Sequence, residues 1–172
     1  MIDVDEYHRM ADLGLIAPDS RVELLDGEVV EMAPIGTRHN ACVIRLTRRF
    51  VLAIGNRAAL SAQGSIRLGR FSEPQPDVAV LKPRDDDYAS RYAEPEDVLL
   101  LIEVADSSAR KDRTRKVPLY LKSGVPEVWL IDLKAGTIEV YIGDTVRTLR
   151  AGETLSPQAF PDIVLEVAEF LV

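Results

Sequence analysis

The residues of this chain whose types and spacing best suit chemistry are two acids and a lysine. Asp77 opens a short apolar segment, Glu103 ends a run of five apolar residues, and Lys116 follows in a basic stretch. Two carboxylates projected from adjacent strands can chelate a divalent cation through oxygen ligands. A nearby lysine can then orient an attacking water or stabilise charge that develops on a phosphate. These three residues therefore predict metal-dependent cleavage of a phosphodiester.

Each of the three residues also has an interpretation without chemistry. Asp77 fits an exposed carboxylate at a strand end. Lys116 fits a solvated lysine on a helix, where Asp112 and Tyr120 share its face. Glu103 is harder to explain in this way, because it lies at the rim of a buried strand. A lone carboxylate there must be paired, protonated or bound to a cation, and a local arginine is the alternative partner.

Three further residues could extend such a site. Glu28 and Glu23 lie on the two arms of a predicted hairpin, where either could add a third carboxylate. A surface hairpin with alternating charge explains both glutamates equally well. His39 lies at the start of an arginine-rich helix, where it could act as a general base, contact a phosphate or make only a local hydrogen bond.

Composition narrows the class of protein. Cys42 is the only cysteine and lies amid apolar residues, so we expect a core side chain, no internal disulfide and a reducing, cytoplasmic location. The two histidines argue against a multi-histidine metal site. The acidic N-terminus does not resemble a signal peptide, and no apolar run is long enough to span a membrane. Phosphate-loop, dinucleotide-binding and nucleophile-elbow motifs are absent.

Charge is unevenly distributed along the chain. The net charge of −7 argues, taken alone, against a nucleic-acid-binding protein. However, residues 38–57 hold five arginines and no acid, and residues 107–123 hold six cations and one acid. Such asymmetry could give an acidic protein one basic face. The alternative is that both segments are helices with solvated polar sides.

Hydrophobic periodicity and turn residues predict the elements that position these side chains. The expected helices cover residues 3–13, 38–54 and 112–123. The expected strands cover residues 21–25, 28–32, 58–62, 65–68, 77–81, 98–104, 128–131, 137–142, 145–150 and 163–165, followed by a tail. Pro118 predicts a kink in its helix, or a helix that begins later than Asp112. This order of elements predicts one α/β domain over residues 1–172, with a mixed sheet and an N-terminal β-hairpin.

Several motifs resemble those of the Uma-type family of endonucleases. They are residues 22–28 (VELLDGE), 76–77 (PD), 103–108 (EVADSS), 112–120 (DRTRKVPLY) and 124–132 (GVPEVWLID). The resemblance covers about residues 20–142 in the correct order, which short motifs rarely achieve by chance. It implies membership of the PD-(D/E)XK superfamily, a restriction-endonuclease-like fold with a core sheet of four or five strands, and a Mg²⁺-dependent nuclease site that could also use Mn²⁺.

The resemblance also implies roles for individual residues. Asp77 corresponds to the acid of the PD motif, and Glu103 to the second acid, so these two would bind the metal. The superfamily lysine normally follows two residues later, where this chain has Ala105. Lys116 would then be a migrated lysine that reaches the same space from the helix. Glu28 and His39 match positions that recur in the family.

On this basis we expect a cytoplasmic, Mg²⁺-dependent endonuclease that acts on DNA, and by analogy a homodimer. The residues expected to contact phosphates without reading sequence are Arg45, Arg48, Arg49, Arg113 and Arg115. Ala105 and the acidic net charge favour a rival: a nuclease fold without catalysis that binds nucleic acid or protein. An enzyme acting on a smaller phosphate ester and a purely structural oligomer are two further alternatives.

Overall fold

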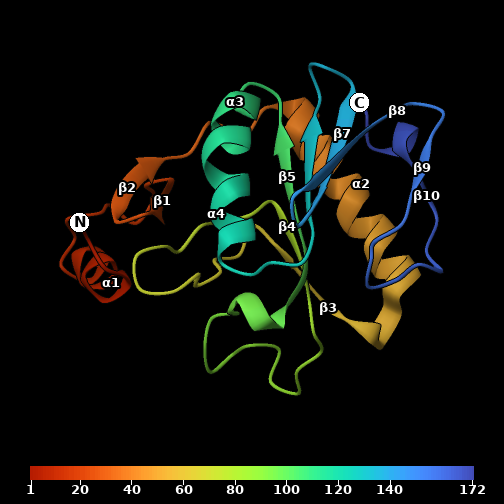
Figure 1. Ribbon diagram of the computed structural model, residues 1–172. Helices are drawn as coiled ribbons and strands as arrows, with labels where there is room; N and C mark the ends of the chain where they lie inside the picture. Colours follow the sequence, from red (N-terminus) through yellow and green to blue (C-terminus); the bar gives the residue numbers. More distant parts are fainter.

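The centre of the molecule is a six-stranded mixed sheet. The computed structural model describes all 172 residues and orders the strands β3-β4-β5-β6-β7-β8 (Figure 1). Their bounds are β3 (Ala59–Ala62), β4 (Val78–Leu81), β5 (Val98–Ala105), β6 (Val128–Asp132), β7 (Thr137–Ile142) and β8 (Thr145–Arg150). Only β5 and β6 are parallel. The expected α/β fold with a mixed sheet is confirmed, with the β7–β8 hairpin extending the sheet to six strands.

Helices cover both faces of this sheet (Figure 1). Helix α2 (Thr37–Ile54) packs against one face, where the rings of Phe50 and Trp129 meet at an interplanar angle of 54° in the larger apolar core. The other face carries a continuous helical segment made of α3 (Ala109–Lys111), the π-helical η3 (Asp112–Lys116) and α4 (Val117–Lys122). Because successive strand residues alternate between faces, Leu101 and Ala105 of β5 face α4, and Glu103 between them must do the same.

The N-terminal hairpin forms a separate small sheet beside the main one. Strands β1 (Val22–Leu25) and β2 (Glu28–Glu31) meet at Asp26 and Gly27, whose φ angles of 49° and 76° are those of the expected type I′ turn. Backbone hydrogen bonds between Leu24 and Glu73 hold the hairpin against the body of the protein. Helix α1 (Val4–Asp12) precedes the hairpin, and a capping box between Asp3 and Glu6 begins it.

Two expectations about strands and helices in the body of the protein are corrected. Residues 65–68 contribute one isolated bridge at Ile66 and no strand. The helix expected to begin at or after Asp112 begins at Ala109, and Pro118 is accommodated because the turn before it is π-helical. Proline has no N–H for the carbonyl four residues earlier, so a wider turn at this point costs little hydrogen bonding.

The C-terminal residues are part of the core and do not form a loose tail. Strands β9 (Thr154–Leu155) and β10 (Leu165–Glu166) pair with each other, and the 3₁₀ turn η4 (Val167–Glu169) follows. Phe170 is fully buried against the α2 side of the sheet. Two more 3₁₀ turns, η1 (Gly55–Arg57) and η2 (Pro95–Asp97), complete the secondary structure.

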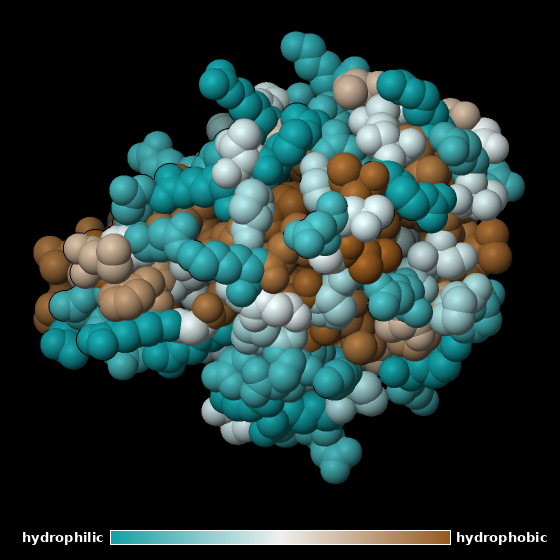
Figure 2. Space-filling model, viewed as in Figure 1, coloured by the Kyte–Doolittle hydropathy of each residue, from teal (hydrophilic) through white to brown (hydrophobic).

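The surface view separates polar from apolar regions. In Figure 2 the lower lobe, where Figure 1 places the loop between β4 and β5, is almost entirely teal, and apolar atoms show between the elements above it. No helix in the structure combines the length and apolar character that crossing a bilayer requires.

Candidate active site

Strand register brings the two predicted metal ligands together. Val78 of β4 pairs with Ile102 of β5 in an antiparallel ladder, so the next positions, Asp77 and Glu103, lie opposite each other. The backbone N–H of Val104 donates to Asp77 Oδ2 at 2.8 Å, which fixes this carboxylate against β5. Both acids are buried, at 8% and 3% exposure. The carboxylates therefore meet where adjacent strands were expected to place them.

Lys116 joins these acids from the π-helical segment η3. Its Nζ lies 2.8 Å from Glu103 Oε1 and 3.1 Å from Glu23 Oε2. Lys116 is the only lysine or arginine among the buried residues of the chain. Burial opposes its charge, but the carboxylates of Glu103 and Glu23 outweigh that effect and raise the pKa of the ammonium. The interpretation of Lys116 as a solvated helix lysine is therefore excluded.

Glu103 lies in an unusual electrostatic environment. The Tyr120 hydroxyl donates to Oε1, the same oxygen that contacts Lys116. Burial raises the pKa of Glu103 to about 8 against the opposing effect of Lys116, and the negative charge of Asp77 adds to this rise. None of these contacts uses Oε2. A carboxyl group held in this way gains strongly from an additional cation.

His39 stands on the other side of Asp77. It lies in the first turn of α2, and its Nε2 is 3.0 Å from Asp77 Oδ1. The hydrogen bond to Asp77 raises the pKa of the imidazole, against a smaller opposing effect of burial. Its Nδ1 is buried and has no hydrogen-bond partner. His39 thus fixes the second oxygen of Asp77, as Val104 fixes the first.

The sequence left the choice between Glu23 and Glu28 open, and the structure separates them. Glu23 is 2% exposed, and its Oε2 accepts a hydrogen bond of 3.2 Å from the Gln75 backbone. The side chain of Glu28 is 70% exposed, pairs with Arg115 at 2.6 Å and does not line the cleft. The available signal was position: Glu23 interrupts an apolar strand in VELL, whereas Glu28 follows the turn directly.

These side chains line a cleft of about 730 Å³ between the hairpin and the helical segment α3–η3. Only four of its nineteen lining residues are hydrophobic. Asp112 of η3 also lines the cleft and accepts a hydrogen bond from Ser108, while burial raises its pKa. Cys42 lies elsewhere, fully buried, and burial raises the pKa of its thiol to about 12, as expected for a core residue.

Four of the five arginines expected to contact phosphates are engaged within the protein. Arg45 and Arg49 both bind Glu169, through its carbonyl at 3.3 Å and its carboxylate at 2.8 Å. Arg113 holds Glu139 through two guanidinium nitrogens, and Arg115 pairs with Glu28. Arg48 is exposed and makes no ion pair. The basic segments thus fasten distant parts of the chain, which the sequence pattern did not indicate.

The cleft supplies some, but not all, of the ligands that a divalent cation such as Mg²⁺ requires. Asp77 and Glu103 offer carboxylate oxygens, and a bound cation would offset the burial and the repulsion from Asp77 that raise the pKa of Glu103. No group of three or more histidine, cysteine, aspartate or glutamate side chains is arranged to hold a metal ion. Water and substrate oxygens would therefore complete the coordination, which is usual for Mg²⁺.

Comparison with known proteins identifies the family and the fold of this chain. The family described as "Uma2: Putative restriction endonuclease" matches residues 4–168. A crystal structure of "a putative nuclease belonging to DUF820" from Anabaena variabilis superimposes with a TM-score of 0.82 at 17% identity, covering 99% of this chain and 98% of that one. It shows the same fold. A search of curated proteins gave no match. From the match over nearly its whole length, this chain belongs to the Uma2 family of putative restriction endonucleases.

Proposed function

We propose that this protein is a Mg²⁺-dependent nuclease that hydrolyses phosphodiester bonds in DNA. One observation carries the proposal: Asp77 and Glu103 face each other across neighbouring strands, with the Lys116 ammonium 2.8 Å from Glu103, in a polar cleft. Family membership and the nuclease-like fold support the same conclusion. An endonuclease acting on duplex DNA has two strands to cut, and a homodimer is the simplest arrangement that would do so.

Asp77 and Glu103 would hold the metal ion. When bound, Mg²⁺ supplies positive charge to the scissile phosphate and acidifies a coordinated water. The contribution of the chain is to keep both carboxylates in place: Val104 and His39 each hold one oxygen of Asp77, while Tyr120 and Lys116 hold Glu103. Such preorganised partners reduce the motion needed when charge develops on the substrate.

Lys116 fills the role of the lysine that Ala105 replaces. Ala105 lies two residues after Glu103 on the same face of β5, so a lysine there would place its ammonium beside Glu103. Lys116 delivers its ammonium to that place from the helix packed over the same face. A lysine ammonium therefore lies beside Glu103 although residue 105 is an alanine, and this supports a catalytic role for the site.

A second candidate is a nuclease fold that binds nucleic acid or protein without cleaving it. The arginines favour the protein-binding form of this alternative, because four of the five expected phosphate contacts are engaged within the chain, namely Arg45, Arg49, Arg113 and Arg115. Phosphate contacts supply most of the non-specific affinity for DNA, so engaging these four arginines elsewhere weakens DNA binding through them. The buried acids and Lys116 have no evident use in such a module, and we therefore rank it second.

The test is nicking of supercoiled plasmid by purified protein with Mg²⁺, Mn²⁺ or EDTA. Wild type should nick only with a divalent metal, and Asp77→Asn should reduce the rate at least about 100-fold, since even outer-shell partners of a metal ligand are worth roughly 10- to 100-fold. Glu127→Gln is the control, because Glu127 is also a buried carboxylate but lies outside the cleft. Nicking that survives Asp77→Asn unchanged would reject this site.

A further inference from the structure

Glu23 is a buried carboxylate that the proposed mechanism does not use as a metal ligand. It lies on β1 of the N-terminal hairpin, which does not belong to the main sheet. At 2% exposure it is buried as deeply as Glu103. Burying an ionised carboxylate is costly unless a partner compensates, so its contacts with other groups explain its place.

One of those contacts holds Glu23 against the segment that leads to Asp77. Oε2 accepts a hydrogen bond from the backbone N–H of Gln75, two residues before Asp77. The hairpin that carries Glu23 is itself tied to this segment by paired backbone hydrogen bonds between Leu24 and Glu73. The position of the Glu23 carboxylate is therefore set relative to β4 and not by the hairpin alone.

The second anchor is Lys116. Its Nζ lies 3.1 Å from Glu23 Oε2 and 2.8 Å from Glu103 Oε1, so two acids from different sheets share one ammonium. An ammonium has three donors, and these two acids engage two of them. The four-carbon stem of lysine is flexible, and a single partner would leave its direction unfixed. Two partners hold Nζ between them and leave one N–H for a substrate phosphate.

We propose that Glu23 is the positioning residue for Lys116, and that the N-terminal hairpin is thereby a required part of the active site. This inference rests on the proposed nuclease function for its catalytic consequence only. Glu23 touches neither substrate nor reacting atoms: it acts by directing the Lys116 ammonium towards the carboxylate pair. Removing its charge leaves Lys116 with one partner, Glu103, and its ammonium free to turn.

Glu127 provides the matched control. It is 1% exposed and, like Glu23, accepts a hydrogen bond from a distant backbone N–H, that of Gln158 at 2.7 Å. Its other oxygen accepts from Trp129, and it does not line the cleft. A glutamine at either position keeps the size and one acceptor oxygen. Differences between Glu23→Gln and Glu127→Gln therefore report on the cations that Glu23 contacts, Lys116 at 3.1 Å and the partly exposed Lys111 at 3.9 Å, and not on burial.

The first test follows the Lys116 ammonium directly, by ¹⁵N-detected exchange of its protons with water, with the signal assigned by its absence in Lys116→Arg. We expect a slowly exchanging signal in wild type and in Glu127→Gln, and its loss in Glu23→Gln. A signal that exchanges equally slowly in Glu23→Gln overturns the proposal. If Glu23→Gln does not fold, Glu23→Asp replaces it, because aspartate keeps the charge but is too short to reach Lys116. The slowly exchanging signal should again be lost, and its persistence in Glu23→Asp would overturn the proposal.

The second test measures cleavage kinetics. Glu23→Gln should lower kcat about 10- to 100-fold, the usual effect of an outer-shell partner, while KM for DNA changes little. Glu23→Asp, whose shorter side chain does not reach Lys116, should lower kcat by a similar factor. An unchanged kcat in Glu23→Gln overturns the proposal. A wild-type protein that cleaves nothing refutes the proposed function instead, and the ammonium exchange then still decides whether Glu23 positions Lys116.

Discussion

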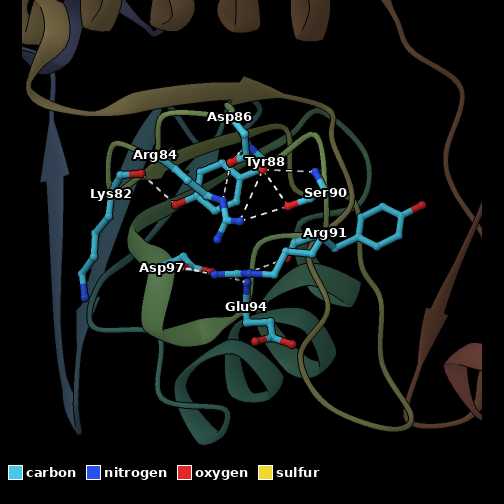
Figure 3. A network of polar contacts seen from close by, with 9 residues as sticks. Lys82, Arg84, Asp86, Tyr88, Ser90, Arg91, Glu94 and Asp97 are labelled. Atoms are coloured by element: carbon cyan, nitrogen blue, oxygen red, sulfur yellow. Dashed lines mark hydrogen bonds and ion pairs between the residues drawn. The ribbon is translucent and has the colours of Figure 1, made fainter.

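Two polar networks in this protein use the same side-chain types with opposite results. The loop between β4 and β5 carries the first, in which each of two arginines binds its own aspartate (Figure 3). Arg91 holds Asp97 through two nitrogens, at 2.6 and 3.0 Å, and both guanidinium groups lie within 6 Å of the Tyr88 ring. In this loop network charges are matched, and the hydrogen bond from Arg91 lowers the pKa of Asp97.

The cleft holds the second network, in which acids outnumber cations. Four buried carboxylates face one buried lysine, Lys116, together with the partly exposed Lys111 and His39. The acids are Glu23, Asp77, Glu103 and Asp112. Burial here raises the pKa of Glu103 to about 8, whereas in the partly exposed loop network the hydrogen bond from Arg91 lowers the pKa of Asp97. The difference teaches that the loop is complete by itself, while the cleft keeps an electrostatic deficit that a divalent cation would fill.

Removing the cation from each network should give the largest contrast. Lys116→Met leaves Glu103 and Glu23 buried without their partner and should cost about 3–5 kcal/mol of unfolding free energy. Arg91→Met breaks a partly exposed pair and should cost no more than about 1 kcal/mol. Denaturant unfolding of both variants in EDTA measures the difference. Equal losses of unfolding free energy in the two variants would mean that burial does not make the Lys116 ion pairs more important for stability than the Arg91 pair.

The two networks should also differ in the sign of their pH dependence. Because the pKa of Glu103 is raised from 4.5 to about 8, its contribution to stability is present below about pH 4.5 and is lost as the pH rises towards 8. Relative to Glu103→Gln, wild type in EDTA should therefore lose about 2 kcal/mol or more between about pH 5 and 9. The pKa of Asp97 is lowered, so its contribution is instead lost as the pH falls.

Chemical denaturation across that pH range decides between these signs. Asp97→Asn serves as the comparison, since the difference in unfolding free energy between this variant and wild type should decrease only at acidic pH. A difference between wild type and Glu103→Gln that stays constant from mildly acidic to alkaline pH would show that Glu103 remains ionised throughout, with Lys116 fully compensating its burial.

His39→Gln should have a smaller effect, confined to the metal site. The imidazole Nε2 holds Asp77 Oδ1 at 3.0 Å, so its loss should weaken divalent-metal affinity and nicking by about 10- to 100-fold, as for other outer-shell partners. Calorimetric titration with Mn²⁺ and plasmid nicking measure the two effects. If nicking falls while Mn²⁺ affinity is unchanged, His39 acts on the substrate and not through Asp77.

Glu28→Gln should have the smallest effect of the series. Its side chain is 70% exposed and its pair with Arg115 is a surface salt bridge, worth about 0–1 kcal/mol. Nicking should stay within about twofold of wild type, since Glu28 does not line the cleft. A large loss of activity in Glu28→Gln would restore the role that the family resemblance implies for this residue.

Local chemistry explains which elements could be predicted from the sequence. Asp26 and Gly27 encode the hairpin turn, and the apolar runs of β4 and β5 predict the buried strands that carry Asp77 and Glu103. The sequence therefore also predicted that these two acids lie close together, because residues at the facing ends of adjacent strands are neighbours. Pro118 misled the helix boundary, since a π-helical turn depends on packing over the sheet and not on propensity alone.

What could not be predicted depends on partners far apart in the sequence. Glu23 meets Lys116 across 93 positions, and Arg49 meets Glu169 across 120. Nothing near Arg49 in the sequence distinguishes a buried pair from a solvated charge, and the place of Glu23 within VELL indicates burial without indicating its partner. The same limitation made Glu28 appear equivalent to Glu23, and made the arginines appear to be free phosphate contacts.

The measurement that tests the cleft's electrostatic deficit most directly is Mn²⁺ binding, followed by the paramagnetic resonance signal of the free ion. Wild type should bind Mn²⁺ more tightly than Glu103→Gln and Asp77→Asn, and Arg91→Met in the loop network should bind like wild type. Each cleft variant should lose the tight site. Tight binding that survives in both cleft variants would contradict this expectation, because the buried carboxylate pair would then not be the metal site.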